Sequence, residues 1–408
     1  MDRKFRWISK GLHNNFLYNL GKLGVNLRMK GYMKEALLYF LRETQAAFTG
    51  RRPVIWCSTF IPSELVYAVG GVPFMPEVAA GFAAAVGVAN EVLLEAEGDW
   101  LNADLCSIHR CGTGLVKKEL VPKPDLIISS SHLCDGAKKY LQYISYQFDC
   151  PYYLLETPYQ LEDAGWLAEQ IRSLTKELAK GGVDFGPVFS LSNRAYRYHQ
   201  RVNQLRKAVP ATFSGEHAMN LVPMEFMSFG SKGGLRFYRE LAEELEGRVK
   251  GGEGVIPEER YRLLWLHLKP YYPQQIFSSL REMGAVIAFE EYSQLYWELL
   301  DPEKPYLSLA RKMINHFGWG PLQRQLERIY KLIYDYQIDG VIGFSQWGCR
   351  QSSGRMGMIK DSLKKKGIPF LNLDGDLVDT RNYREGQLLT RLQAFVELID
   401  EQKGCGVC

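Results

Sequence analysis

The sequence predicts an α/β protein with two lobes, each built on a parallel sheet, and a helical segment that connects them. Short apolar runs alternate with helical stretches in two separate series along the chain, an alternation typical of parallel sheets with crossover helices. A mostly helical, polar stretch at 157–258 separates the two series. The 408 residues, 46% of them hydrophobic, suffice for two or three domains and exclude a disordered or fibrous chain.

The first part of the chain divides into an N-terminal helical segment at 1–50 and a first α/β lobe at 51–160. Within the helical segment, residues 33–48 repeat apolar side chains at helical spacing without a breaker. In the lobe, one helix is predicted to open at 61–64, with a cap and an acidic first turn, and another to span 137–148. The strands of this lobe are predicted at 53–56, 125–129 and 152–156.

A helical connector at 161–258, with a glycine-rich break at 250–254, leads to a second α/β lobe at 259–408. The second lobe again alternates strands and helices, although its sequence does not repeat that of the first lobe. Its strands are predicted at 263–268, 285–290, 339–345 and 368–374. Its helices are predicted at 273–283, 323–337, 356–367 and 386–402.

Charge and hydropathy argue against nucleic acid and membranes as partners. The chain has 50 basic and 46 acidic residues and a net charge of +4, so it lacks a strong electrostatic field. Its most apolar stretch, 71–90, has nearly the length of a membrane span but contains Pro73, Pro76 and Glu77. We therefore expect a buried loop and helix there. The basic start lacks the apolar core of a secretory signal, and the expected location is the cytoplasm.

The cysteines are the first candidates for chemistry. A reducing compartment disfavours disulfides, so the eight thiols are either small buried hydrophobes or ligands. Cys57, Cys134 and Cys349 follow predicted strands, and Cys106 follows the small-residue helix. Loops at one rim of a parallel sheet converge, and scattered thiolates brought together there can hold an iron–sulfur cluster or, alternatively, zinc.

The remaining cysteines are more ambiguous. Cys111 lies five residues after Cys106, about 140° around a regular helix, so the two cannot bind one ion unless the helix ends between them. Cys111 is then a ligand of a second metal group or a structural thiol. Cys150 precedes a strand, at the end away from the expected site, where core packing is expected. Cys405 and Cys408 form a CxxC pair at the C-terminus, which is either a loose tail or a metal or redox site.

Other candidate residues lie near these cysteines. His109 and His132 can donate a hydrogen bond to sulfur or move a proton, although an ordinary half-buried histidine is the competing interpretation. Glu64 lies in a helix first turn, where it either acts in catalysis or only complements the helix dipole. Gln346 and Arg350 flank Cys349 and are positioned to contact a ligand.

Two catalytic motifs are missing from the sequence. The chain contains neither a glycine-rich phosphate loop in a strand–helix context nor a nucleophile elbow. If ATP is used, we therefore expect a partner protein to hydrolyse it.

Several segments together resemble the 2-hydroxyacyl-CoA dehydratase family, which includes the D-component and the benzoyl-CoA reductase subunits. The resemblance extends over about residues 53–400 in the family's order. The matching segments are CSTFIPSELVYAVGGVP at 57–73, DLCSIHR at 104–110, DLIISSSHLCDGAKK at 125–139, GCRQSS at 348–353, LDGD at 373–376 and TRLQAFVE at 390–397.

The resemblance implies two Rossmann-like lobes with an iron–sulfur cluster between or beside them. It implies that Cys106, Cys134 and Cys349 are the cluster thiolates. It also implies an oxygen-sensitive, anaerobic chemistry and a separate dimeric activator protein, which carries its own 4Fe–4S cluster and hydrolyses ATP to deliver low-potential electrons.

Within this family, GFSQWGCRQSSG at 343–354 is most similar to the double-cubane cluster proteins, which are homodimers. Their 8Fe–9S cluster reduces small molecules and needs extra thiolates, for which Cys57 and Cys111 are candidates. A sixth ligand would have to be Cys150, Cys405 or Cys408. The first hypothesis is thus a double-cubane reductase of a small-molecule substrate.

Two further hypotheses remain open. One is a 2-hydroxyacyl-CoA dehydratase component with a single 4Fe–4S cluster, which acts through a ketyl radical and uses an open iron as a Lewis acid. The other is a non-catalytic electron carrier or metal-binding scaffold.

Overall fold

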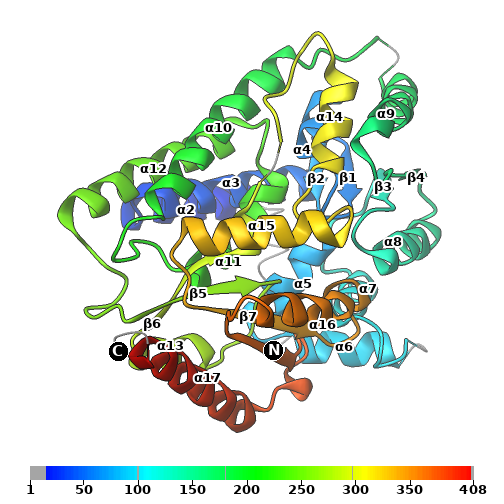
Figure 1. Cartoon of the computed structure of the whole chain (residues 1–408). Helices are drawn as coiled ribbons and strands as arrows, with labels where there is room; N and C mark the ends of the chain where they lie inside the picture. Colours follow the sequence, from blue (N-terminus) through cyan, green and yellow to red (C-terminus); the bar gives the residue numbers. More distant parts are fainter. Residues whose placement is uncertain (1–14, 99–100, 180, 296, 406–408) are drawn as a thin grey trace.

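The computed structural model describes residues 15–98, 101–179, 181–295 and 297–405 and confirms the predicted fold class (Figure 1). Two parallel four-stranded sheets form the two lobes. The first sheet has the order β2-β1-β3-β4, with strands β1 (Val54–Cys57), β2 (Val72–Phe74), β3 (Leu126–Ser130) and β4 (Tyr152–Leu155). The second has the order β6-β5-β7-β8, with strands β5 (Tyr261–Leu266), β6 (Ala285–Glu290), β7 (Gly340–Gln346) and β8 (Phe370–Gly375).

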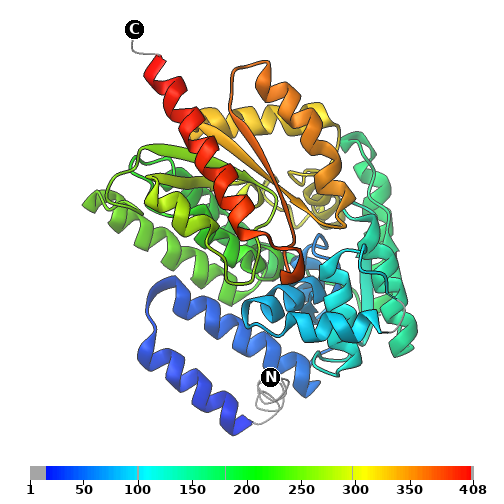
Figure 2. The ribbon, with the colours of Figure 1, turned by 90° about the horizontal axis from the view of Figure 1, so that it is seen from below.

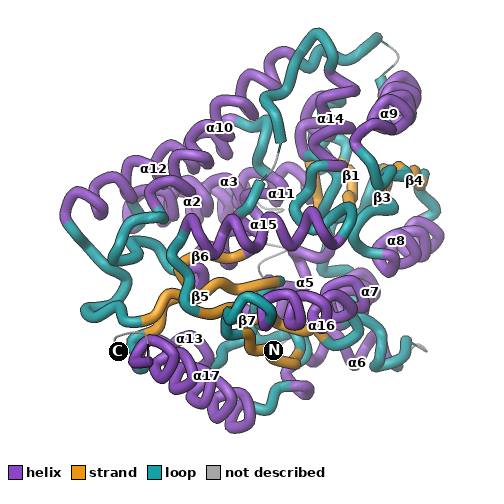
Figure 3. The backbone as a smooth tube through the Cα atoms, in the orientation of Figure 1, coloured by secondary structure: helices purple, strands orange, loops and turns teal. Residues whose placement is uncertain are grey.

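Helices surround the sheets, as Figure 3 shows by colour. The helices in the first half of the chain are α2 (Asn15–Arg28), α3 (Gly31–Thr49), α4 (Ser63–Ala68), α5 (Pro76–Ala85), α6 (Ala89–Glu97), α7 (Ser107–Lys117), α8 (Asp135–Phe148), α9 (Ala164–Leu178) and α10 (Gly186–Leu205). Those in the second half are α11 (Gly215–Met227), α12 (Lys232–Gly251), α13 (Ile276–Glu282), α14 (Pro305–Ile314), α15 (Leu322–Asp335), α16 (Arg350–Lys364) and α17 (Glu385–Cys405).

The two sheets have the same strand order when each is counted along its own chain segment. In both, the first strand pairs with the second on one side and with the third on the other. Parallel strands align their carboxyl ends at one rim, so β3 and β7 occupy equivalent positions in their sheets. The loops that follow them carry Cys134 and Cys349.

The stretch at 71–90 differs from the expected loop and helix, because it begins with strand β2. This strand has three residues, and Pro73 lies in its middle. Proline cannot donate to a sheet ladder and is tolerated on an edge strand, which is where β2 lies. So short a strand has no alternation that would reveal it in the sequence, whereas the helix expected after it is present as α5.

Each lobe sends an excursion between its second and third strands onto the other lobe. Helices α5 to α7 follow β2, but their small apolar residues pack in one core cluster with β5 and β7 of the second sheet. Conversely, α14 follows β6 and packs with β1, β3 and α9 of the first lobe. Figure 1 shows α14 beside α4 and α5 to α7 near α16. The lobes therefore share their cores.

The helices between the sheets form the third part of the molecule. The long helices α10 and α12 pack against each other, and α12 packs against α3. Figure 2 shows α2 and α3 side by side at one edge of the molecule, with α17 crossing the second lobe. A buried ion pair at 2.5 Å joins Arg206, directly after α10, to Glu290 at the end of β6. Among the described residues, no helix combines the length and apolarity needed to cross a membrane.

Candidate functional site

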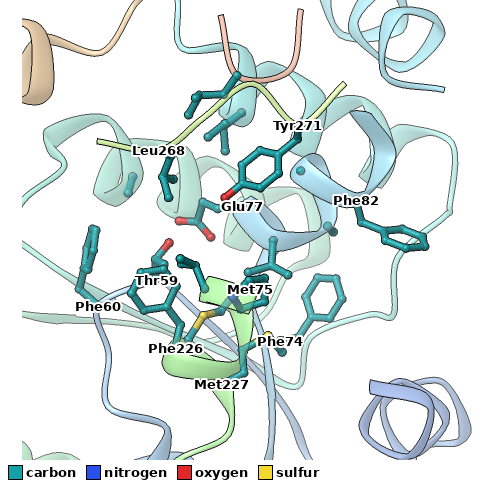
Figure 4. A pocket seen from close by; sticks show the side chains of 18 of the residues that line it. Thr59, Phe60, Phe74, Met75, Glu77, Phe82, Phe226, Met227, Leu268 and Tyr271 are labelled. Atoms are coloured by element: carbon teal, nitrogen blue, oxygen red, sulfur yellow. The ribbon is translucent and has the colours of Figure 1, made fainter. Parts of the chain in front are cut away.

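A cavity of about 750 Å³ lies where the two lobes meet. Its walls come from α3 and α5, from α11, and from the loops that follow strands of both sheets. Most of these side chains are apolar, and Figure 4 shows Phe60, Phe226 and Tyr271 around one part of it. A cavity of this size with few polar groups suits an organic ligand.

Three cysteines line this cavity, and each is the residue that directly precedes a helix. Cys106 is the N-cap of α7, Cys134 that of α8, and Cys349 that of α16. Cys106 lies within electrostatic reach of the other two thiols. The sequence predicted these three positions as ligands, and the structure brings them to one cavity. It also starts α16 at Arg350 instead of 356, which makes Cys349 a cap.

The local electrostatics of these thiols combine two opposing effects. Burial raises the pKa of Cys106 well above that of a free thiol, and it raises the pKa of Cys134 to about 12. Backbone N–H groups in the first turns of α7 and α8 donate to the two sulfurs and favour the thiolate. Helix N-termini attract negative charge. Cys106 and Cys134 are thus protonated as free thiols, while the helix N-termini favour their thiolate form once a cationic metal is bound.

A buried hydrogen-bond network ties the two lobes together beneath these cysteines. Asp376, after β8, accepts a hydrogen bond from Ser107 of α7, the residue next to Cys106. Gln346, at the end of β7, donates to Ser107 at 3.0 Å. Gly348 has φ +75°, and a Cβ on it would lie 2.8 Å from the backbone oxygen of Asp104. The loops of Cys106 and Cys349 therefore approach each other closely, and the absence of a side chain at Gly348 permits this.

The donor set fits a cluster better than a single ion. Three thiolates on one zinc ion would stand about 3.8 Å apart, given a Zn–S distance of about 2.3 Å. Among the described residues, no three Cys, His, Asp or Glu side chains gather tightly enough for one ion. A cubane spreads its thiolates, because each binds a different iron. Three half-buried thiols on separate loops around one cavity match that requirement.

His109 lies next to these thiols. Its Nε2 is 4.0 Å from the Cys134 sulfur, and its ring stacks on Tyr140 with centroids 4.9 Å apart. Burial lowers the pKa of His109 to about 4, so the ring is neutral at physiological pH. A neutral ring so placed can donate a hydrogen bond to a thiolate.

Glu77 is a cavity residue that sequence reasoning did not identify. It lies in the first turn of α5 and accepts hydrogen bonds from the backbone and the hydroxyl of Thr59. In Figure 4 its carboxylate faces the interior, with the Thr59 hydroxyl beside it. Burial raises the pKa of Glu77 to about 7. Such a carboxyl can exchange a proton near neutral pH. Its position in an otherwise apolar stretch was the available signal.

Two further cavity residues were also missed. His267 follows β5 directly, has φ +75° and is buried, and burial lowers its pKa to about 3. Arg355 of α16 forms a bidentate ion pair with Glu291 at 2.5 and 2.6 Å. His267 was identifiable from its position at a strand end, whereas the Arg355 pair joins residues 64 positions apart.

Cys57 and Cys111 do not line the cavity. Cys57 ends β1 inside the first core cluster, and its sulfur contacts the Ile55 carbonyl oxygen at 3.6 Å. Cys111 lies within α7, inside the second core cluster. Helix α7 begins at Ser107, so Cys106 lies before the helix and Cys111 within it. The angle of about 140° expected for two positions on one regular helix therefore does not apply to this pair. Their role as ligands stays a prediction.

The other predicted residues lie elsewhere. Cys150 is half-buried beside the core near β4. Cys405 ends α17, whereas Cys408 lies outside the described residues. Glu64 is buried away from the large cavity and binds Lys312 at 2.7 Å and Ser192 at 2.5 Å. The Glu64–Lys312 pair joins α4 to the excursion helix α14.

His132 and Arg350 also lie off the large cavity. His132 is buried, its Nδ1 lies 2.8 Å from Ser130 Oγ, and burial lowers its pKa to about 3. It lines a separate, smaller cavity. Arg350 is exposed on the first turn of α16, while its neighbour Gln346 lines the large cavity.

The chain is similar in sequence to several known proteins. Residues 58–399 match the family model for the 2-hydroxyglutaryl-CoA dehydratase D-component. The (R)-phenyllactyl-CoA dehydratase alpha subunit of Clostridium sporogenes is 23% identical, over 92% of this chain and 97% of its own length. A benzoyl-CoA reductase subunit of Thauera aromatica is 24% identical, over 85% and 89%. The (R)-2-hydroxyisocaproyl-CoA dehydratase alpha subunit of Clostridioides difficile is 24% identical, over 86% and 91%.

Proposed function

Because this chain belongs to the 2-hydroxyglutaryl-CoA dehydratase D-component family, we propose that it is an iron–sulfur enzyme whose cluster is held by Cys106, Cys134 and Cys349. One observation carries this proposal. Three N-cap thiols from separate loops line one cavity beside a carboxyl group with a pKa near neutrality. Among the described residues, the smaller neighbouring cavity has no cysteine in its walls.

The number of cavity thiols favours a single cubane over the double cubane that we first expected. A double cubane needs more protein thiolates than three, and the candidates Cys57 and Cys111 are fully buried in apolar cores. Bringing either sulfur to the cavity requires repacking of a strand end or a helix. A 4Fe–4S cluster with three thiolates requires no such change.

The chain's own residues can bind a substrate and handle its protons. When bound, the cluster supplies single low-potential electrons and an iron without a protein thiolate, which acts as a Lewis acid. Apolar side chains such as Phe74, Phe82 and Phe226 enclose the organic part of the substrate and exclude water. Glu77 holds or releases a proton at its carboxyl, and His109 stabilises negative charge on the Cys134 sulfur.

Electrons are proposed to come from an ATP-hydrolysing iron–sulfur activator protein. The sequence has no phosphate loop of its own, which is consistent with ATP hydrolysis in a partner. Two of the relatives are named as alpha subunits and a third as one subunit of a reductase. These names indicate that the relatives assemble with a second, different subunit, and the homodimer that we expected for this chain stays a prediction.

Two reactions are compatible with this site, namely reduction of a small molecule and dehydration of a 2-hydroxyacyl-CoA. Both are tested by mixing the anaerobically purified chain with the activator, ATP and either acetylene, benzoyl-CoA or (R)-phenyllactyl-CoA. We expect ATP-dependent bleaching of the cluster's visible absorption, followed by product from one probe class. Ethylene or a ring-reduced thioester indicates reduction, and a 2-enoyl-CoA indicates dehydration.

The Cys150→Ala variant is the matched control, because Cys150 lies away from the cavity. It should bleach as the unmodified chain does, whereas Cys106→Ala should not. Absence of any ATP-dependent electron uptake by the iron-loaded chain would contradict the proposal and favour a metal-binding scaffold.

A further inference from the structure

A second, smaller cavity of about 50 Å³ lies next to the large one. Four residues line both cavities: Thr59, Phe60, Phe226 and Phe317. The three aromatic rings form the partition between them, and Thr59 is the only hydroxyl-bearing residue in this shared set. The far wall comes from the excursion helix α14 and the segment before it, which includes Trp297.

The small cavity concentrates buried polar atoms without a protein partner. Glu225 Oε2, His132 Nε2, His316 Nε2 and Trp297 Nε1 have no hydrogen-bond partner among the described residues. All four residues line this cavity. An unsatisfied buried polar group costs about 1–3 kcal/mol, and four around one space indicate that something polar fills it.

The mixture of donors and acceptors identifies what fills it. His316 Nδ1 accepts the Gly318 N–H at 3.3 Å, and burial keeps this ring neutral by lowering its pKa well below its usual value, so His316 Nε2 carries a hydrogen and donates. Trp297 Nε1 also donates, while Glu225 Oε2 accepts. Two N–H donors do not suit a cation, and the acceptor Glu225 Oε2 does not suit an anion. The Lys312 ammonium in the same wall is already bound to Glu64. Water satisfies both kinds of group, and the volume holds about two or three molecules.

Charged neighbours hold the side chains that line the small cavity in place. Glu225 holds His199 at 3.3 Å through its other oxygen. Lys312 is bound to Glu64 at 2.7 Å and lies 4.0 Å over the Trp297 ring. The polar atoms that face the cavity are therefore presented by side chains that are anchored elsewhere.

We propose that the small cavity is a water chamber that supplies protons to Glu77 through the Thr59 hydroxyl. Thr59 borders the chamber and donates to Glu77, which faces the large cavity. An excess proton carried by the chamber waters passes to the Thr59 oxygen while the Thr59 hydroxyl proton passes to the Glu77 carboxylate. The chamber water that gives up the proton is left neutral, so each O–H bond formed is matched by one broken. This inference rests on the proposed function and extends it.

A proton supply distinguishes the two reactions considered above. A two-electron reduction consumes two protons, whereas dehydration releases water and consumes no proton overall. A hydrated chamber separated by aromatic rings from an apolar substrate cavity serves the first reaction, because it delivers protons without admitting bulk water. The chamber therefore favours a reductase.

The first test is a crystal structure of the anaerobically purified protein at a resolution that resolves ordered water. We expect two or three waters that bridge Glu225 Oε2 to His316 Nε2 and Trp297 Nε1. An empty or apolar-filled chamber would overturn the proposal. This result does not depend on cluster content, so it is separable from failure of the proposed function.

The second test follows protonation of Glu77 in the metal-free protein. Light-released protons are added at pH 8, and the carboxyl infrared band is assigned by its loss in Glu77→Gln. The band should grow at least about tenfold more slowly in Thr59→Val, whereas Thr59→Ser should keep the original rate. Trp297→Phe, which removes one chamber donor but keeps an aromatic ring, should slow it by a smaller factor.

Equal rates in all variants would show that protons reach Glu77 through the large cavity, and the proposal would be wrong. Slowing in Thr59→Val but none in Trp297→Phe would assign Thr59 a role without the chamber and would overturn the chamber's part. Folding of each variant is checked by its urea midpoint, because a merely destabilised protein would not be rescued by Thr59→Ser.

Discussion

The two lobes share one strand order but use it differently. In each, the third strand leads into a helix whose N-cap is a cysteine, Cys134 in the first lobe and Cys349 in the second. The excursions between the second and third strands are not equivalent. That of the first lobe brings Cys106, whereas that of the second brings the Lys312 and His316 wall of the small cavity.

This difference indicates how the site is built from a symmetric plan. Equivalent rims supply two thiols, and the exchanged excursions supply the two unequal components, a third thiol and a polar chamber. Each excursion packs in the core of the other lobe. Neither lobe therefore has a complete site by itself, and loss of contact between the lobes should affect the site before it unfolds either sheet.

The largest effect is expected from the three cavity cysteines. Replacement of Cys106, Cys134 or Cys349 by alanine should remove most of the iron, because a cubane with two protein thiolates is poorly held. The measurement is iron per chain after anaerobic purification and gel filtration. If iron binding requires only Cys134 and Cys349, the excursion of the first lobe, which carries Cys106, is not part of the metal site.

The matched controls are the two core cysteines. Cys57→Ala and Cys111→Ala should keep the iron and lose about 1 kcal/mol of stability, as expected for deletion of one buried sulfur. Loss of half the iron in either variant would favour the double cubane and would oppose the division between cavity and core thiols.

The next effect is expected at Asp376, which joins the lobes. Asp376→Ala leaves the buried Ser107 hydroxyl and the Gln346 amide without their carboxylate partner. The free energy of unfolding should fall by about 3 kcal/mol, and the cluster should be lost more readily. The matched control is Asp374→Ala, whose side chain is 65% exposed and which should change stability by less than about 0.5 kcal/mol. Equal effects in urea unfolding would contradict the linking role.

Glu77→Gln should alter the pH dependence of stability. The pKa of Glu77 is about 7 in the folded chain against about 4.5 unfolded, so the folded state binds its proton more tightly. The stabilisation is complete below about pH 4.5 and is lost as the pH rises through 7. Glu77→Gln has no carboxyl to titrate, so its stability does not fall in this way. The free energy of unfolding of the variant, relative to that of the original chain, should therefore be about 2 kcal/mol higher at about pH 8 than at about pH 5. Urea unfolding of both proteins at about pH 5 and about pH 8 measures this change. A difference in stability that does not depend on pH would contradict a raised pKa of Glu77 in the folded chain.

The smallest effects compare a glycine from each lobe. Gly348→Ala places a Cβ against backbone at φ +75° and should cost about 2 kcal/mol. Gly136→Ala places a Cβ 2.9 Å from the His109 ring and at ordinary contact distance, 3.8 Å, from the Cys134 sulfur, and should cost about 1 kcal/mol. Gly357→Ala, in α16 with open space around it, should be neutral or slightly stabilising. Thermal or urea unfolding ranks the three, and the reverse order would contradict the close loop approach.

Much of this fold was predictable because local patterns determine it. Seven of the eight strands were expected within three residues of their ends, since each is a short apolar run next to a turn or a helix. Three of the five suggested ligands lie at one cavity. Cys134 and Cys349 do so for the reason given, namely that strand-end loops meet at a rim, whereas Cys106 is brought there by the excursion of α5 to α7. The exception, β2, has too few residues for any period to be seen.

The rest depended on contacts between distant segments. The sequence of helices α5 to α7 does not indicate which of the two sheets they pack against, because burial against either lobe requires the same apolar side chains. The sequence shows Glu77 as an acidic residue in an apolar stretch and Asp376 within the LDGD segment, but their contacts with Thr59 and Ser107 come from distant parts of the chain. Cys57 follows the strand-end rule but points into the core, as alternate residues of a strand do.

The most direct measurement is iron and acid-labile sulfide per chain in the anaerobically purified protein. A cluster held by Cys106, Cys134 and Cys349 alone predicts about four irons and about four sulfides per chain. About eight irons with slightly more sulfide would contradict this account. It would mean that thiols now buried in the cores, Cys57 or Cys111, reach the cavity in the loaded protein.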